Sequence, residues 1–217
     1  MCRTIQITGK GMLKIKPDQI LLKLSLSKTL ESYEEAIKKS VEEVNEVKQI
    51  LEEAGLDKKE LKTTYYSIKP DYESVRDNKG NYVTQLKGYK YNQDLNYKFD
   101  IDNKILGKVL YSLSKSTENV QIDLEYTIKN PEEAKNELLK LAVEDAYAKA
   151  KILSESAQVR LGKILKIDFS SKQFDFSSKP FERGMMLSSK MCAIDSIDIE
   201  PEDITKNEDV TIIWEIE

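Results

Sequence analysis

The acidic pairs of this chain are the first residues that could support acid–base chemistry. Glu144 and Asp145 are adjacent within a helical pattern, and Glu132 and Glu133 are adjacent at its start. Adjacent side chains on a helix point about 100° apart, so neither pair can act as one catalytic dyad. Asp145 lies beside the apolar stripe of the pattern, and we expect it to be a buried acid held by a lysine or a backbone N–H. A catalytic acid would need a partner that the sequence does not identify.

Histidine is absent from the 217 residues, and only two cysteines are present, Cys2 and Cys192. The absence of histidine excludes Ser-His-Asp and Cys-His catalysis and imidazole-ligated zinc. Two cysteines cannot form a four-thiolate zinc site. We therefore expect no catalytic residues, no metal and no cofactor. The simplest interpretation of the cysteines is one terminal thiol and one small buried residue, and a redox role is the alternative.

Two glycines near the N-terminus superficially resemble a phosphate-binding loop, in the run Thr8-Gly9-Lys10-Gly11. The run lacks the upstream glycine of a P-loop, and a strand pattern follows it instead of a helix whose N-terminus would hold a phosphate. We expect a bulge or a bend here, made by the two glycines.

Tyrosine is abundant, with eleven in the chain, and several lie on one side of the alternating run 88–101. Tyr89, Tyr91 and Tyr97 could stack on a small molecule, which makes a small-molecule binding module on a Tyr-rich sheet face the alternative function. Cross-strand packing explains them more simply. A net charge of −4, with only four arginines among 34 basic residues, predicts no binding of nucleic acid.

An apolar connection without periodicity spans residues 170–191. Long apolar connections of this kind usually cover something or contact a partner chain. Packing within the chain and a ligand lid are the two alternatives to a subunit contact. We predict a homo-oligomer with no other identified protein partner, and the candidate contact residues are Phe174, Phe176, Phe181, Met185 and Met186.

The elements that would position these residues can be read from hydrophobic periodicity. Helices are expected at 32–54, where Ser32 and Glu35 fit a capping box and Gly55 ends the run, at about 103–113, and at 131–157. Strands are expected at 5–15, 19–28, 61–72, 88–101, 120–128, 161–169, 193–199 and 209–217, the first two forming a hairpin. The predicted class is α+β: mostly antiparallel sheet of about eight strands, with three helices on one face and one long helix in the C-terminal half.

The organisation expected from these elements is a single domain over residues 1–217, and two α/β sub-lobes at about 1–85 and 86–217 are the alternative. No segment approaches the ~20 apolar residues that a transmembrane helix needs. The first residues lead directly into a strand pattern, without the features of a signal peptide. The chain as written is therefore expected in the cytoplasm, or in the periplasm or outside the cell if it is a trimmed mature form.

Three groups of residues, taken in their order, resemble one family. They are Ile7-Thr8-Gly9-Lys10-Gly11 with Pro17-Asp18, then Asp145-Ala146 and Lys149-Ala150 with Leu161-Gly162-Lys163, and finally Ile199-Glu200-Pro201 with the strand to Trp214. This arrangement is similar to the SIMPL-domain family, a domain of unknown function found in bacterial periplasmic immunogenic and oxidative-stress-defence proteins. The chain departs from the family at Gln158, where helices of the family commonly end in glycine.

What the resemblance implies is a self-associating, non-enzymatic protein with a role in oxidative-stress protection or cell-envelope physiology. The family supplies no catalytic residues and no cofactor to carry over to this chain. A thiol-dependent antioxidant that uses Cys192 is a further hypothesis, favoured only by the association of the family with stress.

Overall fold

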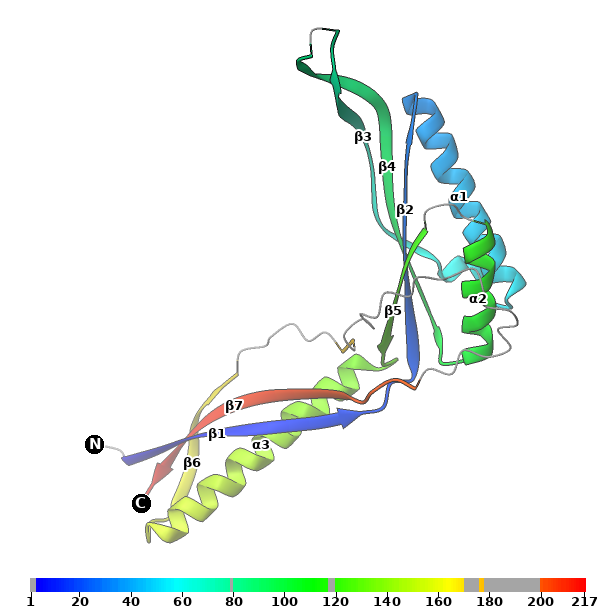
Figure 1. Cartoon of the computed structure of the whole chain (residues 1–217). Helices are drawn as coiled ribbons and strands as arrows, with labels where there is room; N and C mark the ends of the chain where they lie inside the picture. The colour runs from blue at the N-terminus through cyan, green and yellow to red at the C-terminus, as the bar shows by residue number, and fades with distance from the viewer. Residues whose placement is uncertain (1–2, 79, 117–119, 170–175, 178–199) are drawn as a thin grey trace. The chain divides into compact units, whose positions relative to one another are not determined.

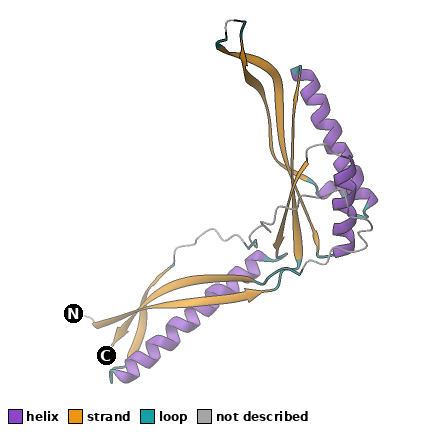
Figure 2. Ribbon diagram, viewed as in Figure 1, coloured by secondary structure: helices purple, strands orange, loops and turns teal. Residues whose placement is uncertain are grey.

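The protein is described by a computed structural model that covers residues 3–78, 80–116, 120–169, 176–177 and 200–217. These residues form three α-helices and seven strands, and the strands make two antiparallel sheets (Figures 1 and 2). The α+β class and the long helix in the C-terminal half are confirmed. Eight strands were expected, and the one at 193–199 lies outside the described residues.

The chain divides into two compact units, each with its own sheet. Unit 1 takes the described residues of 1–18, 127–178 and 201–217, and unit 2 takes those of 19–126 together with Glu200. Unit 1 thus brings together the two ends of the chain, whereas the sub-lobes suggested by the sequence were consecutive stretches.

Unit 2 contains a four-stranded sheet in the order β3-β4-β2-β5. Its elements are β2 (Gln19–Leu30), α1 (Tyr33–Glu53), the 3-10 helix η1 (Lys58–Glu60), β3 (Lys62–Arg76), β4 (Tyr82–Asp100), α2 (Asn103–Ser116) and β5 (Val120–Thr127). Both helices cover the same face of the sheet and share one apolar core with it. The core includes Leu22, Leu24, Leu26, Val47, Leu51, Leu95, Leu106 and Leu113, all at most 1% exposed.

Helix α1 begins and ends where local sequence predicts. Ser32 Oγ accepts the N–H of Glu35 at 3.2 Å, and Glu35 Oε2 accepts the N–H of Ser32 at 3.1 Å, which completes the capping box. At the other end Gly55 adopts a left-handed φ of +87°, and the N–H of Leu56 reaches the carbonyl of Leu51 at 2.9 Å. These caps satisfy helix-end groups that would otherwise have no partner.

Strand β4 has one buried and one wetter face, as its alternation predicts. Tyr91, Leu95 and Tyr97 are at most 3% exposed and face the helices. The opposite face carries polar pairs such as Ser25 with Asp94, whose Oγ and Oδ1 are 2.7 Å apart. The Tyr-rich side of the strand therefore belongs to the core of unit 2.

Unit 1 contains a three-stranded sheet in the order β1-β7-β6, with one helix along it (Figure 1). Its elements are β1 (Arg3–Ile15), α3 (Pro131–Ser156), β6 (Leu161–Asp168) and β7 (Ile204–Ile216). Strand β1 pairs with β7 over its full length, from Arg3 opposite Ile216 to Ile15 opposite Ile204. The main core of the unit lies between α3 and this pair of strands and contains Ile7, Ala142, Ala146, Ala150, Val210, Ile212 and Trp214.

The hairpin expected from residues 5–15 and 19–28 is wrong. Strand β1 pairs with β7 in one sheet, whereas β2 pairs with β4 in the other. The physical reason is that the two strands bury different apolar faces: Ile7 packs against α3, and Ile20 packs in the core beneath α1 and α2. The helices are likewise divided between the two sheets. No helix in the described part of the chain is both long enough and apolar enough to cross a membrane.

Candidate functional site

The two glycines of β1 lie directly beneath α3. A Cβ atom built on Gly9 would be 2.1 Å from the carbonyl oxygen of Ala142, and one on Gly11 would be 2.1 Å from that of Leu138. The strand remains in regular register with β7 through both positions, so the expected bulge or bend is wrong. Glycine is required here because the helix backbone occupies the space of a side chain.

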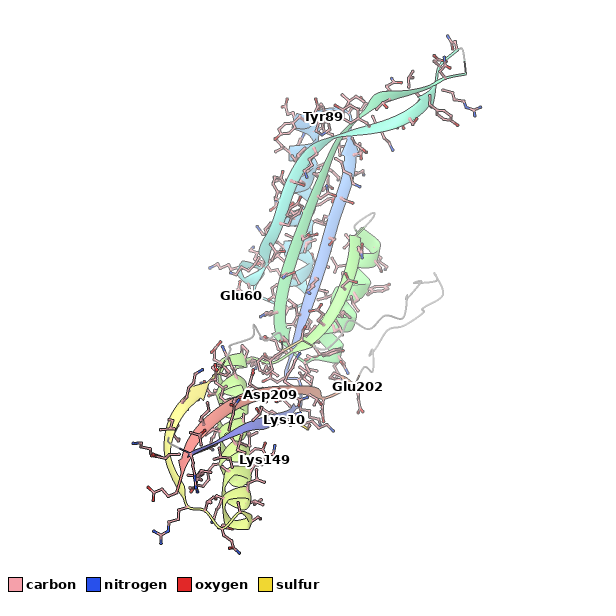
Figure 3. The ribbon with its side chains drawn as sticks, turned by 90° about the vertical axis from the view of Figure 1, so that its left-hand side faces the viewer. Lys10, Glu60, Tyr89, Lys149, Glu202 and Asp209 are labelled. Carbon is pink, nitrogen blue, oxygen red and sulfur yellow. The ribbon has the colours of Figure 1, made fainter. Side chains whose placement is uncertain are left out.

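Asp145 connects the same two elements. Its Oδ2 accepts the backbone N–H of Lys10 at 2.7 Å and the ammonium of Lys149 at 2.7 Å, and both lysines are labelled in Figure 3. The hydrogen bond from Lys149 and then the one from Lys10 lower the pKa of Asp145 below its ordinary value. The expected lysine and backbone donors are therefore both present, but the side chain of Asp145 is 34% exposed rather than buried. Some of the residues that carry the resemblance, namely Gly9, Lys10, Gly11, Asp145 and Lys149, thus join β1 to α3.

The buried tyrosines of unit 2 are hydrogen-bonded within the core. The hydroxyl of Tyr91 donates to the buried carboxylate of Glu43, and that of Tyr97 donates to the carbonyl of Asp57 at 3.1 Å. Burial, followed by the nearby Glu43, raises the pKa of Tyr91, and burial likewise raises the pKa of Tyr97. Tyr89 is half-buried and makes an edge-to-face contact with Tyr33, with ring centroids 5.8 Å apart. Among the described residues, the three tyrosines therefore give no specific observation in favour of the small-molecule alternative.

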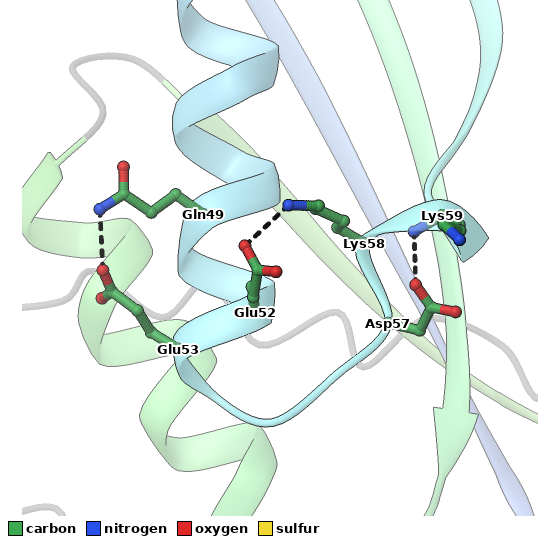
Figure 4. Close-up of polar contacts among 6 residues, drawn as sticks. All are labelled: Gln49, Glu52, Glu53, Asp57, Lys58 and Lys59. Atoms are coloured by element: carbon green, nitrogen blue, oxygen red, sulfur yellow. Dashed lines mark hydrogen bonds and ion pairs between the residues drawn. The ribbon is translucent and has the colours of Figure 1, made fainter.

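A surface hollow lies along the C-terminal half of α1, and Figure 4 shows the polar contacts of Gln49, Glu52, Glu53 and Lys58 there. It is lined by Asn45, Lys48, Gln49, Glu52, Glu53 and Lys58. Lys58 Nζ lies 2.9 Å from Glu52 Oε2, and Gln49 Nε2 donates to Glu53 Oε1 at 2.9 Å. Because these polar groups are exposed and bond to one another, none is held ready for a ligand. Among the described residues, no group of three acidic, cysteine or histidine side chains could hold a metal ion.

Of the five candidate contact residues, only Phe176 is described. It is 4% exposed and packs with Ile128, Leu138 and Ile204 in a small apolar cluster of unit 1. The other four, Phe174, Phe181, Met185 and Met186, lie outside the described residues. A subunit contact made by this set stays a prediction.

Strand β6 carries an exposed apolar surface that the sequence pattern did not single out. Ile164 lies opposite Trp214 and Ile167 lies opposite Ile212, so both point to the side of the sheet that α3 covers. They are nevertheless 50% and 55% exposed. Among the described residues, the helix lies mainly over β1 and β7, and only Leu161 of the edge strand β6 packs against the core beneath it.

The flank of α3 nearest to β6 extends this surface. Val143 and Tyr147 each follow a buried alanine by one position and are 39% and 56% exposed. Asp145 is on the opposite flank, where it contacts β1 at the other sheet edge, so helical geometry directs Val143 and Tyr147 toward β6. We call the combined surface the β6 strip; it consists of Val143, Tyr147, Ile164, Ile167 and Phe169.

The similarity to known proteins extends over nearly the whole chain. A family model described as SIMPL, protein of unknown function (DUF541), matches residues 5–214. Two relatives are 29% identical over 214 residues, which cover 98% of this chain and 84% of each relative. They are the 26 kDa periplasmic immunogenic proteins of Brucella melitensis biotype 1 and of Brucella abortus strain S19. The matched residues therefore span most of β1, the long helix α3 and parts of both sheets.

Proposed function

The chain belongs to the SIMPL family, whose function is unknown, and on that premise we propose that it is a non-enzymatic protein that self-associates through the β6 strip. The observation that carries the proposal is the exposure of Ile164 and Ile167 on an edge strand. An edge strand presents unpaired backbone groups, and exposed apolar side chains beside them favour pairing with another chain.

The polar clusters of the described residues support a structural role rather than catalysis. The carboxylates of Asp145, Glu43 and Glu52 each have a partner within the chain. The sequence contains no histidine that could serve as a general base near neutral pH. These features hold elements together, and no reacting group stands in a cleft among them.

The proposed setting is the bacterial cell envelope. The Brucella relatives are named periplasmic proteins, and this favours an exported location over the cytoplasmic one expected from the sequence. A role in oxidative-stress protection or envelope physiology belongs to the same proposal and is supported by the family resemblance. Detection in the periplasmic fraction of the source bacterium is expected, and recovery in the cytoplasmic fraction alone would contradict it.

Self-association can be measured by sedimentation velocity of the full chain over a wide range of concentration. We expect the wild type to associate as concentration rises, because burial of the β6 strip removes apolar area from water. The variant Ile167→Lys should remain monomeric. The matched control is Met12→Lys, which changes an exposed apolar residue of β1, 67% exposed, at the opposite sheet edge.

Two outcomes would overturn the proposal. One is a wild type that stays monomeric at every concentration. The other is an Ile167→Lys variant that associates as strongly as the wild type while its thermal unfolding is unchanged.

A further inference from the structure

We propose that β6 pairs antiparallel with β6 of a second copy, about a two-fold axis that passes between Leu165 and Lys166. The inference rests on the proposed self-association and adds the geometry of the contact. Pairing would join the three strands of each copy into one continuous six-stranded sheet. The two-fold makes the contact self-complementary, because each copy offers the same surface.

The choice of β6 over the other edge follows from the contacts of β1. Asp145 already accepts the N–H of Lys10 at the β1 edge, and Lys14 is paired there with Asp203 at 3.3 Å. A backbone group that is already occupied protects a sheet edge from further pairing. Charged side chains do not distinguish the two edges, because β6 also carries Lys163, Lys166 and Asp168. Strand β6 has no strand on its outer side among the described residues, and its apolar residues Ile164, Leu165 and Ile167 are about half exposed.

The sequence of β6 selects one register for pairing with itself. With the axis between Leu165 and Lys166, Ile164 faces Ile167 of the second copy, and Lys163 faces Asp168 of the second copy. Ile164 and Ile167 then form apolar pairs, and Lys163 and Asp168 form pairs of opposite charge. At the centre Leu165 faces Lys166 of the second copy, and at the end Phe169 faces Gly162. Directly opposed pairs of this kind stabilise a sheet by about 0.2–1 kcal/mol each in general.

The neighbouring registers lose this match. An axis on Leu165 would place Ile164 against Lys166 of the second copy and Lys163 against Ile167. An axis on Lys166 would place the two copies of that lysine against each other and Ile164 against Asp168. Opposed like charges destabilise a sheet, and a shift by one residue moves the apolar set out of alignment.

The irregularity of β6 is compatible with this pairing. Ile164 and Ile167 are three residues apart, yet both face the α3 side because the register with β7 shifts between Ile164 and Lys166. A two-fold axis at this point places the irregular stretch of one copy against the same stretch of the other. The apolar strips of the two copies then lie on one side of the joined sheet.

The charges lie on the opposite side of the sheet and already form pairs within one copy. Lys163 Nζ is 3.6 Å from Glu215 Oε2, and Lys166 Nζ is 2.9 Å from Asp168 Oδ2. In the proposed register, the Lys163–Glu215 pair of one copy lies beside the Lys166–Asp168 pair of the other. Acidic and basic side chains then alternate across the contact. Networks of surface charges contribute more than isolated surface ion pairs.

Charge reversal tests the register. Lys163→Asp alone and Asp168→Lys alone each place like charges opposite one another twice per dimer, so each should weaken association by roughly tenfold. The double variant exchanges the charges and should recover most of that loss. The control is Lys14→Asp, since Lys14 is also an exposed, ion-paired lysine, at 70% against 75% for Lys163, and it should associate like the wild type.

A cross-link tests the same register without relying on charge. In a background with Cys2→Ser and Cys192→Ser, one chain carries Leu165→Cys and the other carries Lys166→Cys. Mild oxidation of the mixture should give a disulfide-linked heterodimer, because directly opposed residues lie within reach of a disulfide. Either chain alone should cross-link much less.

The outcomes separate this inference from the proposed function. If Ile167→Lys abolishes association but the charge reversals and the cysteine mixture have no effect, the β6 strip binds in another way and the two-fold pairing is wrong. If the wild type is monomeric at every concentration, both proposals fail. Rescue by the double charge variant supports the pairing, and a double variant weaker than both single ones contradicts it.

Discussion

At Gly9, strand β1 lies so close to the backbone of α3 that a side chain has no room. A Cβ there would lie 2.1 Å from the carbonyl oxygen of Ala142 and 2.4 Å from the nitrogen of Ala146, and both atoms belong to the helix backbone. Gly9→Ala must therefore move α3, and we expect it to lower the free energy of unfolding by about 1–3 kcal/mol or more. Urea denaturation measures this loss.

The control for that substitution lies on the same strand. Gln6→Ala changes an exposed side chain on the other face of β1 and should alter the free energy of unfolding by at most about 0.5 kcal/mol. A Gly9→Ala variant as stable as Gln6→Ala would show that α3 does not approach the strand so closely.

Asp145 makes the stability of unit 1 depend on pH. Its pKa is lowered from the ordinary 3.8 by Lys149 and the N–H of Lys10, so the folded state favours the carboxylate. The stabilisation is then fully present above the ordinary pKa and is lost as pH falls through the lowered one. Asp145→Asn should be less stable than the wild type at about pH 7, and the difference should shrink toward about pH 3.

Urea unfolding at a series of pH values tests the role of Asp145. Glu144→Gln serves as the control, because Glu144 is an exposed neighbour on the same helix. A stability difference between wild type and Asp145→Asn that is constant over the acid range would contradict the assignment.

The ends of α1 and α3 use the same hydrogen-bond pattern with different residues. In α3 the N–H of Val159 reaches the carbonyl of Ser154 at 3.0 Å, and Gln158 takes a left-handed φ of +57°. In α1 the left-handed position is Gly55. Helices of the family commonly end in glycine at the position of Gln158. Helix α3 keeps a left-handed cap there, and the non-glycine residue bears backbone strain.

Relief of that strain should be measurable. Gln158→Gly should raise the free energy of unfolding by about 1 kcal/mol, since the strain removed exceeds the added freedom of the unfolded chain. Gln158→Ala keeps the Cβ atom and should give no such gain. Thermal unfolding of the wild type and of the two variants measures the difference in stability. A Gln158→Gly variant less stable than the wild type would contradict the prediction.

The hairpin of β3 and β4 continues past the end of β2. Pairing of β2 with β4 ends at Leu30 opposite Tyr89, whereas β3 and β4 remain paired out to Arg76 opposite Tyr82. Tyr72 is 60% exposed in this extension. An isolated two-stranded ribbon contributes little stability of its own.

Removal of the extension should therefore leave unit 2 folded. Replacement of residues 73–85 by Asn-Gly, a turn suited to a two-residue hairpin loop, should change the free energy of unfolding by less than about 1 kcal/mol. Circular dichroism during urea unfolding measures the change. A loss of several kcal/mol would mean that the extension packs on the rest of the chain.

Local features of the elements could be predicted from sequence, and their partners could not. The Ser32 capping box and the glycine stop of α1 involve residues close in the chain, so periodicity and capping rules find them. The pairing of β1 with β7 joins residues about 200 positions apart, and alternation alone does not specify which strand lies alongside. The expected hairpin failed for this reason.

The candidate site was partly visible in the sequence. Asp145 and its donors were predicted because an acid beside an apolar stripe needs them. The β6 strip was missed because the exposure of Ile164 depends on which strands α3 covers, and that is a property of packing. The apolar residues of 164–169 without strict alternation were the available sequence feature.

The family match extends over residues 5–214 and so includes both units of the molecule. Each unit places helical cover on its sheet, and in the described part of unit 1 Ile164 and Ile167 stay exposed on the edge strand β6. Association through β6 would remove that exposed surface from water, and it would give the molecule a function that needs no catalytic group.

Hydrogen exchange of the full chain at low and high protein concentration tests this central claim most directly, because exchange reports on each strand separately. We predict that the backbone amides of β6 become more protected as concentration rises, whereas those of β1 at the opposite edge do not change. Equal protection of β6 at both concentrations, in samples whose mass shows that the chain has associated, would contradict the account.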